Sequence, residues 1–377
     1  MITLKSYLMP VLRKGPRPSG KIVFSDASPY RSRRLDIEAD EVSTVAYLRD
    51  SGGTVIGAAW IGNHEPAQHR LDLARLNTGL APTMPAGLTS HPEGRTPLDA
   101  TALEVVWFEE GDGAAVLEAG EPLCVIPGWS SLSHGLPGYS RDATGQGPFA
   151  LPFDDEDFDL RIREAREHWV RQRDTAAWGD FQQSVLGHLL SRLGPGGQYL
   201  HDVGRQDGGP VIGVSERPAR EDRPYTVLST LGMSRQRMPA AGLHEKDTTP
   251  HDRVELALAT TLPSGPAGQL LAWLAPYPWR SATRLGPGSV ISWPGRAGAF
   301  PLGDRWAGAL LLDDPSELAL DQLVPDLSGF KVADGDSVRW LWVVPITADE
   351  RTQASSEGST TLLRQMTKDG RSWVAAG

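Results

Sequence analysis

The sequence predicts a mixed α/β protein with two domains, and three observations lead to this prediction. A chain of 377 residues has room for two domains of ordinary size. Apolar residues make up 40% and charged residues 22%, as in globular proteins, and 41 Gly and 30 Pro indicate many turns and short elements. Strand-like alternation and helix-like spacing both occur along the chain. We therefore expect an α+β domain over residues 1–150 and a second domain with a helical lead-in over residues 151–377.

The first domain is predicted to hold short strands around one helix. Four β-like stretches cover residues 42–47, 54–61, 103–108 and 123–126. Between the second and third of these, residues 66–76 have the pattern of a helix with Pro66 in its first turn. Two segments, 82–97 and 128–152, are rich in Gly, Pro and Ser. We expect both to be irregular and the second to connect the two domains.

The helical lead-in is predicted over residues 154–193. Its first half repeats apolar residues at spacings of three and four, namely Phe158, Ile162, Ala165 and Trp169. Its second half does the same with Trp178, Phe181, Val185 and Leu189, and Gly194 and Pro195 then end the pattern. Two amphipathic helices that meet near Asp174 are expected.

The rest of the second domain is predicted to alternate strands with short helices. Strand patterns cover residues 225–231, 254–258, 309–312 and 338–344, and a short helix is expected over 269–275 before Pro276. Trp340 and Trp342 share one face of the last strand, so we expect both in the core. Trp279 and Trp293 stand next to Pro or Gly in loops and are expected to be exposed, where they could line a peptide-binding groove.

Composition limits the classes of function. Cys124 is the single cysteine, so neither an intrachain disulfide nor a thiolate metal cluster can form. Lys5 and Pro10 interrupt the N-terminal apolar run, and no stretch reaches the roughly 20 apolar residues of a membrane span. We expect a cytoplasmic protein without a membrane partner. The formal net charge of −10 argues against nucleic acid and suits a basic protein partner, although it could also serve only solubility.

Catalytic and metal sites are weakly indicated. Ser131 and Ser133 stand beside His134, which leaves a serine hydrolase as an alternative, but neither serine has the two flanking glycines of a nucleophile elbow. The histidine pairs His64/His69 and His244/His251 do not have the spacing of a zinc motif. We therefore predict no catalytic residue, no metal and no cofactor.

A succession of short motifs in the second domain carries a family resemblance. In order along the chain, these are Thr230-Leu231-Gly232-Met233-Ser234, Arg253-Val254-Glu255-Leu256-Ala257-Leu258, Trp273-Leu274-Ala275, Tyr277-Pro278, Leu285-Gly286-Pro287-Gly288, Ala309-Leu310-Leu311-Leu312 and Val343-Val344-Pro345-Ile346-Thr347. Gly232 suits a strand end with positive φ. This order resembles the suppressor-of-fused domain family over residues 178–377. Residues 1–150 resemble no family that we can name.

The resemblance implies a mixed α/β domain that binds proteins and has no known catalytic activity. Animal members of the family clasp a short extended peptide of a transcription factor, which is a form of strand addition. Bacterial members are often grouped with immunity proteins of toxin systems, and the Ala-, Arg- and Gly-rich composition suggests a bacterial source. The resemblance thus implies a protein partner, either a toxin or an extended peptide segment. A regulatory scaffold with a different partner is the alternative.

The long polar loop over residues 234–252 is the predicted partner contact. A loop of this length in a compact domain is often functional. The residues that we expect to contact a partner are Arg235, Arg237, Met238, His244 and Lys246 in this loop, together with Trp279.

Overall fold

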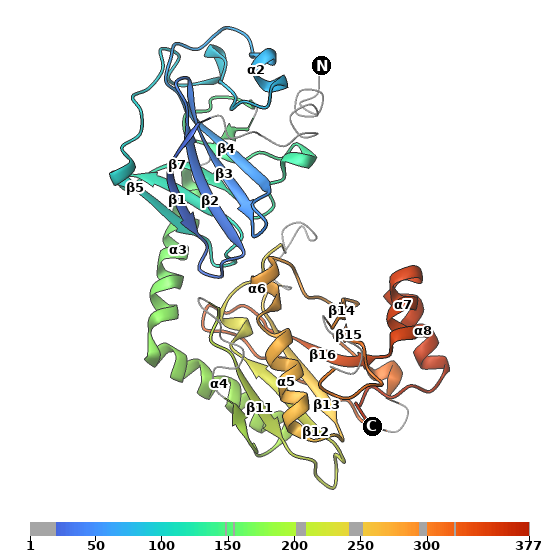
Figure 1. Ribbon diagram of the computed structural model, residues 1–377. Helices are drawn as coiled ribbons and strands as arrows, with labels where there is room; N and C mark the ends of the chain where they lie inside the picture. The colour runs from blue at the N-terminus through green and yellow to red at the C-terminus, as the bar shows by residue number, and fades with distance from the viewer. Residues whose placement is uncertain are drawn as a thin grey trace. The chain divides into compact units, whose positions relative to one another are not determined.

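The computed structural model (Figure 1) describes residues 20–147, 149–153, 155–200, 209–240, 252–293, 300–319 and 322–376. The chain divides into two compact units, Met1–Arg173 and Asp174–Gly377. None of the helices in the described ranges is both long and apolar enough to cross a membrane. Each unit is described by itself below.

The N-terminal unit contains two antiparallel-rich sheets. The first has the order β1-β2-β3-β4, with β1 at Lys21–Ala27, β2 at Arg33–Ala39, β3 at Ser43–Asp50 and β4 at Val55–Asn63. The second has the order β5-β6-β7-β8-β9, with β5 at Leu103–Trp107, β6 at Ala114–Glu118, β7 at Glu121–Ile126, β8 at Tyr139–Ser140 and β9 at Leu151–Pro152. All pairs of neighbouring strands are antiparallel except β8 and β9.

Apolar side chains of the two sheets form one shared core. Ile37 and Ile61 of the first sheet belong to the same buried cluster as Val116 and Ile126 of the second. The helix α3 (Asp155–Arg173) covers the other face of the second sheet, where Phe158 and the residues at 162 and 165 join a separate cluster with β5–β7. Because α3 packs on this sheet, the N-terminal unit extends to Arg173, whereas the sequence prediction placed the helix with the second domain from residue 151.

The C-terminal unit is built on one seven-stranded mixed sheet. Its order is β10-β11-β12-β13-β16-β15-β14, and only β13 and β16 run parallel to each other. The bounds are Tyr199–Leu200 for β10, Gly213–Arg217 for β11, Thr226–Leu231 for β12, Val254–Thr260 for β13, Val290–Ser292 for β14, Gly308–Leu312 for β15 and Arg339–Ile346 for β16. The strands β10 and β14 lie at the two edges of the sheet.

Helices cover both faces of this sheet. The helix α4 (Thr175–Leu193) places Val185 and Leu189 in one core with Ala257, Trp340 and Trp342, and α8 (Ser359–Lys368) adds to the same core. The helix α5 (Ser264–Leu274) packs along β11, β12 and β13, as Figure 1 shows. Successive side chains of a strand point to opposite faces of the sheet, so both faces can carry apolar residues. The remaining helices are α6 (Tyr277–Ser281) and α7 (Ala348–Glu357).

Most predicted elements of the chain are present. The break near Asp174 is confirmed, since α3 ends at Arg173 and the Asp174 side chain accepts a hydrogen bond from the backbone N–H of Ala176 at 2.8 Å. The burial of Trp340 and Trp342 is also confirmed. The mixed fold class is therefore the one that the sequence predicts.

One predicted helix is mostly absent. The helix expected over residues 66–76 is reduced to α2 (Leu73–Asn77), which begins after the N-cap Asp72. The residues before α2 instead form backbone hydrogen bonds with residues far along the chain. The Ala67 N–H donates to Pro92 O at 2.7 Å, and the Ala86 N–H donates to Gln68 O at 2.8 Å.

Candidate functional site

The predicted partner loop begins at a short helical turn. The turn η4 (Met233–Arg235) follows β12, and its N-cap Gly232 has φ 115°, as the sequence predicts. A Cβ at Gly232 would lie 2.3 Å from the carbonyl oxygen of Val211, so only glycine fits there. Residues 241–251 lie outside the described residues, and this range includes His244 and Lys246. The described parts of the loop are its two ends.

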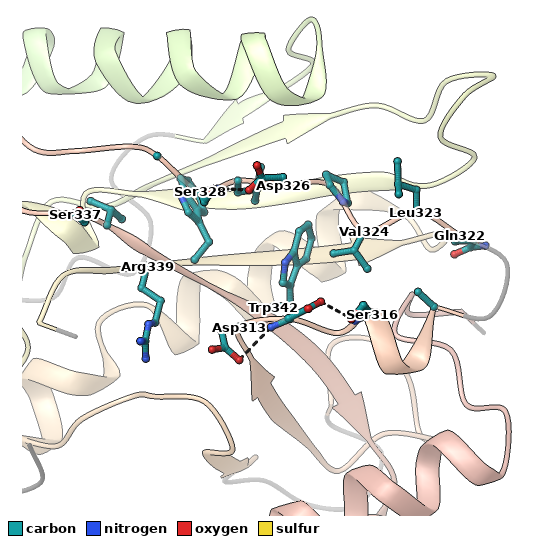
Figure 2. A pocket seen from close by; sticks show the side chains of 17 residues that line it. Asp313, Ser316, Gln322, Leu323, Val324, Asp326, Ser328, Ser337, Arg339 and Trp342 are labelled. Carbon is teal, nitrogen blue, oxygen red and sulfur yellow. Dashed lines mark hydrogen bonds between the residues drawn. The ribbon is translucent and has the colours of Figure 1, made fainter. Parts of the chain in front are cut away.

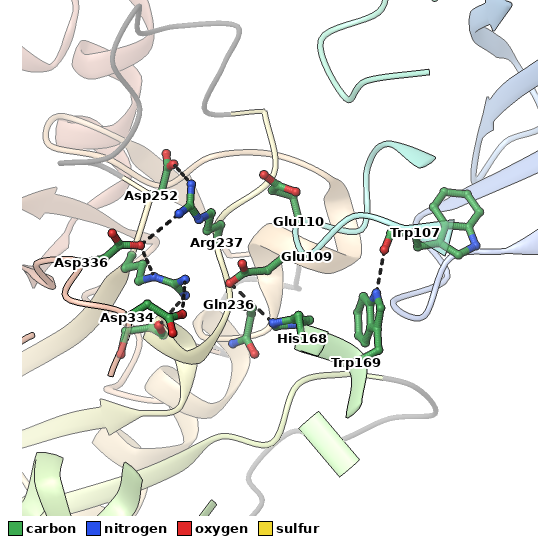
Figure 3. A network of polar contacts seen from close by, with 12 residues as sticks. Trp107, Glu109, Glu110, His168, Trp169, Gln236, Arg237, Asp252, Asp334 and Asp336 are labelled. Atoms are coloured by element: carbon green, nitrogen blue, oxygen red, sulfur yellow. Dashed lines mark hydrogen bonds and ion pairs between the residues drawn. The ribbon is translucent and has the colours of Figure 1, made fainter. Parts of the chain in front are cut away.

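Both arginines at the start of the loop hold structural contacts. The Arg235 guanidinium carbon lies 5.3 Å from the centroid of the Trp178 ring and 5.9 Å from that of Phe181, within cation–π range. Arg237 donates to Asp336 at 3.2 Å and lies 3.8 Å from an oxygen of Asp252 (Figure 3). About a third of the Arg237 side chain is exposed (34%), so a contact between Arg237 and a partner stays a prediction.

Trp279, which was expected to be exposed, is buried, and so is Met238, which was expected to contact a partner. Trp279 is 0% exposed, and its indole N–H donates to the carbonyl oxygen of Arg237 at 3.0 Å. Met238 is 1% exposed, and its backbone N–H donates to the carbonyl oxygen of Asp252 at 2.8 Å. The expectation of an exposed Trp279 is therefore wrong. A position beside Pro278 suggested a loop, but the residue belongs to α6 and its ring fills the core beneath the loop.

A buried carboxylate fixes the turn that precedes the loop. Glu255 on β13 is fully buried, and Oε1 accepts hydrogen bonds from the Gly232 N–H at 2.9 Å, the Ser234 N–H at 3.0 Å and the Ser234 hydroxyl at 2.7 Å. Oε2 accepts from the Thr230 hydroxyl at 2.6 Å. Burial raises the pKa of Glu255, and these hydrogen bonds oppose the rise. Three residues of the Thr-Leu-Gly-Met-Ser motif, Thr230, Gly232 and Ser234, thus donate hydrogen bonds to this one side chain.

A second polar network closes the base of the loop. Arg253 is 3% exposed, and it donates to Asp336 at 2.9 Å and to the carbonyl oxygen of Ser234 at 3.1 Å (Figure 3). Its other terminal nitrogen lies 3.6 Å from an oxygen of Asp334. Asp336 therefore joins Arg253 to Arg237. Since buried ion pairs hold a fixed geometry, this network positions both ends of the loop.

An edge strand offers a place where another chain could pair. The strand β14 pairs with β15 alone among the described strands. Toward β15, the Leu311 N–H donates to Ser289 O at 2.9 Å and the Trp293 N–H donates to Ala307 O at 3.2 Å. In an antiparallel ladder the residues between such positions direct their N–H and C=O groups away. The backbones of Val290 and Ser292 therefore face the outer edge, and the Ser292 side chain is exposed.

Aromatic side chains lie beside this edge. The ring centroids of Trp273 and Trp293 are 4.5 Å apart, those of Trp293 and Phe300 are 5.4 Å apart, and those of Trp273 and Tyr277 are 6.1 Å apart. Trp273, Tyr277 and Trp293 are each partly exposed. Partly exposed aromatic residues are the side chains most enriched at protein interfaces. Trp293 is therefore partly exposed, in the direction that the sequence analysis expected, whereas Trp279 is buried.

The residues of the hydrolase alternative do contact one another. The Ser131 hydroxyl lies 2.8 Å from Nδ1 of His134, and the Ser133 hydroxyl lies 3.2 Å from the same nitrogen. The contact occurs in the one-turn helix η3 (Leu132–His134), where His134 is exposed. A nucleophilic serine needs a base that a third group orients, and no contact to the other ring nitrogen of His134 is present in the described part of the chain. Local turn geometry accounts for this arrangement.

Of the histidine pairs that we considered as metal ligands, the structure describes only His64 and His69, and no further ligands join them in the described ranges. His64 lies with Nε2 2.7 Å from the Thr44 hydroxyl, and burial lowers the pKa of His64. His244 and His251 are outside the described ranges. Within those ranges, no group of three or more His, Cys, Asp and Glu side chains is placed to hold a metal ion.

Comparison with known proteins identifies the domain in the second unit. Residues 208–376 match the family model described as suppressor of fused protein (SUFU). The matched residues all lie in the C-terminal unit, which is therefore similar to this family over most of its length. The match spans less than half of the chain and leaves out the N-terminal unit and α4, although the sequence resemblance began at Trp178.

Solved structures of suppressor-of-fused proteins are similar to this chain at low identity. The Sufu–Fu complex is 16% identical, with a TM-score of 0.36, over 50% of this chain and 85% of that one. A SUFU homolog from Neisseria gonorrhoeae is 15% identical, with a TM-score of 0.36, over 52% of this chain and 93% of that one. Drosophila Suppressor of Fused is 18% identical, with a TM-score of 0.27, over 43% and 40%. No curated protein matches the chain.

Two features of the site were not found from the sequence. The burial of Glu255 was not predicted, because alternation with Val254 and Leu256 does not show that a sheet is covered on both faces. The strand β14 has a usable signal, since Val290 and Ile291 are β-branched and stand between Gly- and Pro-rich stretches. Its position at the edge of the sheet has no signal in the sequence.

Proposed function

We propose that this chain is a non-catalytic binding protein whose suppressor-of-fused domain holds an extended segment of another protein along β14. The observation that supports this most directly is the outer edge of β14, where the backbones of Val290 and Ser292 pair with no described strand. Exposed edges usually carry charges, proline or covering segments that prevent pairing. The edge formed by Val290, Ile291 and Ser292 carries neither charge nor proline.

The chemistry of such an edge suits a peptide. The outward N–H and C=O groups of the edge can form main-chain hydrogen bonds with any extended segment. Pockets for alternate side chains of that segment supply specificity. Trp273 and Trp293 stand next to this edge and present partly exposed rings. A partner segment with apolar or aromatic side chains on one face would pack against these rings while its backbone extends the sheet.

The finer version of this proposal is an immunity role, in which the chain neutralises a toxin encoded nearby. The acidic net charge of −10 would steer a basic partner toward the chain. This version predicts that the gene lies directly downstream of a gene for a secreted toxin and that co-expression protects cells from that toxin. A gene that stands alone would favour a regulatory scaffold with a different partner.

Replacing Ser292 tests the binding mode. Ser292→Pro removes the outward N–H and places a ring on the edge, whereas Ser292→Ala removes only the hydroxyl and serves as the matched control. A pull-down from native cells with the unaltered chain first supplies the partner. We expect Ser292→Pro to weaken binding of that partner by roughly tenfold or more, which corresponds to about 1.4 kcal/mol. Equal affinities for the proline and alanine variants would refute pairing at β14.

A further inference from the structure

A groove lies in the C-terminal unit away from β14. It has a volume of about 1030 Å³ and is bordered by residues 313–319, residues 322–329 and the first half of β16 (Figure 2). Ligand pockets for one small molecule fall between roughly 300 and 1,000 Å³. The groove is therefore large enough for several side chains of a bound segment.

The walls of the groove are apolar and its rim carries one unusually exposed side chain. Figure 2 shows the ring of Trp342 pointing from β16 toward the segment that carries Val324. Leu327 and Val338 also line the groove. Leu323 is 87% exposed, although its carbonyl oxygen accepts a hydrogen bond from the Tyr225 hydroxyl at 2.6 Å. The hydrogen bond thus holds the backbone of Leu323 while its side chain remains in solvent, where a bound segment could cover it.

Two polar atoms in the lining have no partner within the described chain. The indole N–H of Trp340, a residue 6% exposed, is a buried donor without an acceptor. Oε1 of Gln322 is a buried acceptor without a donor. An unmade hydrogen bond of this kind costs about 1–3 kcal/mol. A peptide backbone offers both kinds of partner, a C=O for the Trp340 N–H and an N–H for the Gln322 oxygen.

The rim of the groove is acidic. Asp313, Asp314 and Asp326 belong to the lining, and Arg339 is the basic residue in the described lining. Arg339 is displaced from the apolar wall, since Figure 2 shows its side chain directed away from Val324. The carboxylates bond to nearby backbone: Ser316 N–H donates to Asp314 at 2.9 Å and Ser328 N–H donates to Asp326 at 2.8 Å. Asp313, whose other oxygen accepts from the Asp314 N–H at 3.1 Å, and Asp314 each keep one oxygen for a cation. The second oxygen of Asp326 already accepts from Arg192 at 3.3 Å, so Asp326 is paired within the chain.

We propose that this groove binds a short segment of a partner protein in which apolar side chains are combined with Lys or Arg. The apolar side chains fill the space between Trp342 and Leu323, backbone groups of the segment bond to Trp340 and to Gln322, and the cations meet Asp313 and Asp314 of the rim. Charge complementarity favours this occupant over a neutral or acidic segment. The proposal goes beyond pairing at β14 and rests on the proposed function only in that the occupant is a protein.

Random 12-residue peptides displayed on phage, selected against the full chain, test the occupant. We expect the selected sequences to combine Lys or Arg with Leu, Ile, Phe or Trp. Synthetic copies are then titrated against two variants and their controls. The double variant Asp313→Asn with Asp314→Asn keeps the backbone hydrogen bonds and removes the charges, and Glu221→Gln with Asp304→Asn removes two exposed charges elsewhere in the same unit.

The double aspartate variant should weaken peptide binding about three- to tenfold and reduce its dependence on salt, while the control pair should leave both unchanged. Leu323→Ala should weaken binding by roughly tenfold, whereas Leu190→Ala, at a side chain 55% exposed on α4, should have no effect. Selected peptides without basic residues, or affinities that none of the groove variants changes, would overturn the proposal. Self-association of the chain that Leu323→Ala abolishes would also overturn it, because a second copy would then be the occupant.

The variant Ser292→Pro separates this proposal from the proposed function. The groove peptides should bind Ser292→Pro and the unaltered chain equally well. If the groove variants leave peptide affinity unchanged while Ser292→Pro still weakens binding of the natural partner, the groove proposal alone fails. If the reverse holds, pairing at β14 fails and the groove remains.

Discussion

Replacement of Glu255 is the sharpest test of how the structure positions the partner loop. In Glu255→Ala, the backbone N–H groups of Gly232 and Ser234 lose their acceptor inside the protein. Each buried donor left unpaired costs about 1–3 kcal/mol. The hydroxyls of Thr230 and Ser234 can rotate toward other acceptors and add less. We therefore expect a loss of about 3–5 kcal/mol in the free energy of unfolding.

Glu255→Gln is the matched control for this loss. The glutamine keeps one oxygen for the Gly232 and Ser234 N–H groups, and its NH₂ group can donate to the Thr230 hydroxyl. It also avoids the cost of burying a charge. The expected loss is about 1 kcal/mol.

Urea unfolding followed by tryptophan fluorescence measures both variants. Eight of the twelve tryptophans lie from residue 178 onward, so the signal reports mainly on the C-terminal unit. Similar losses for the alanine and glutamine variants, or a loss below about 1 kcal/mol for alanine, would show that the turn at Gly232 does not depend on this carboxylate.

Four further outcomes are expected. Because burial raises the pKa of Glu255 above its ordinary value of 4.5, the folded chain keeps the carboxyl proton of Glu255 at pH values where the unfolded chain has released it. The free energy of unfolding of the unaltered chain, relative to that of Glu255→Gln, should therefore fall as pH rises above 4.5. A rise would contradict the direction of the pKa shift. Trp279→Ala should lower the free energy of unfolding by about 3–5 kcal/mol in urea, whereas an exposed tryptophan would give almost no loss. Burial raises the pKa of the Cys124 thiol, so Ellman's reagent should react with it only after denaturation; fast reaction with the native chain would show that β7 is accessible. His134→Ala should change no ester or phosphoester turnover, while a loss of about a hundredfold would restore the hydrolase alternative.

Local patterns in the sequence predicted much of the C-terminal unit. The two helices that meet at Asp174 and the strand with Trp340 and Trp342 follow from spacing and from a cap, which are local properties. The strands β1 and β2 were missed, because β1 has no buried position and β2 buries Asp36 and Glu38 together with its apolar residues. Those carboxylates are buried through ion pairs with Arg49, a distant contact that no local pattern contains.

The candidate site depends more on tertiary structure than the fold does. The partner contact predicted for the loop over residues 234–252 stays a prediction, and the described ends of this loop are held inside the unit by Arg237 and Arg253. The exposure of Trp279 was misjudged because neighbouring Pro278 starts α6 instead of a loop. The edge position of β14 follows from the strand order of the whole sheet, which a single segment does not encode.

Amide hydrogen exchange at β14, measured with and without the natural partner, tests the central claim most directly. If the partner pairs with this edge, the outward N–H groups of Val290 and Ser292 should exchange more slowly in the complex, at one partner per chain, and the released partner should be chemically unchanged. Unaltered exchange at both residues in a saturated complex, or a partner that leaves cleaved or modified, would contradict it.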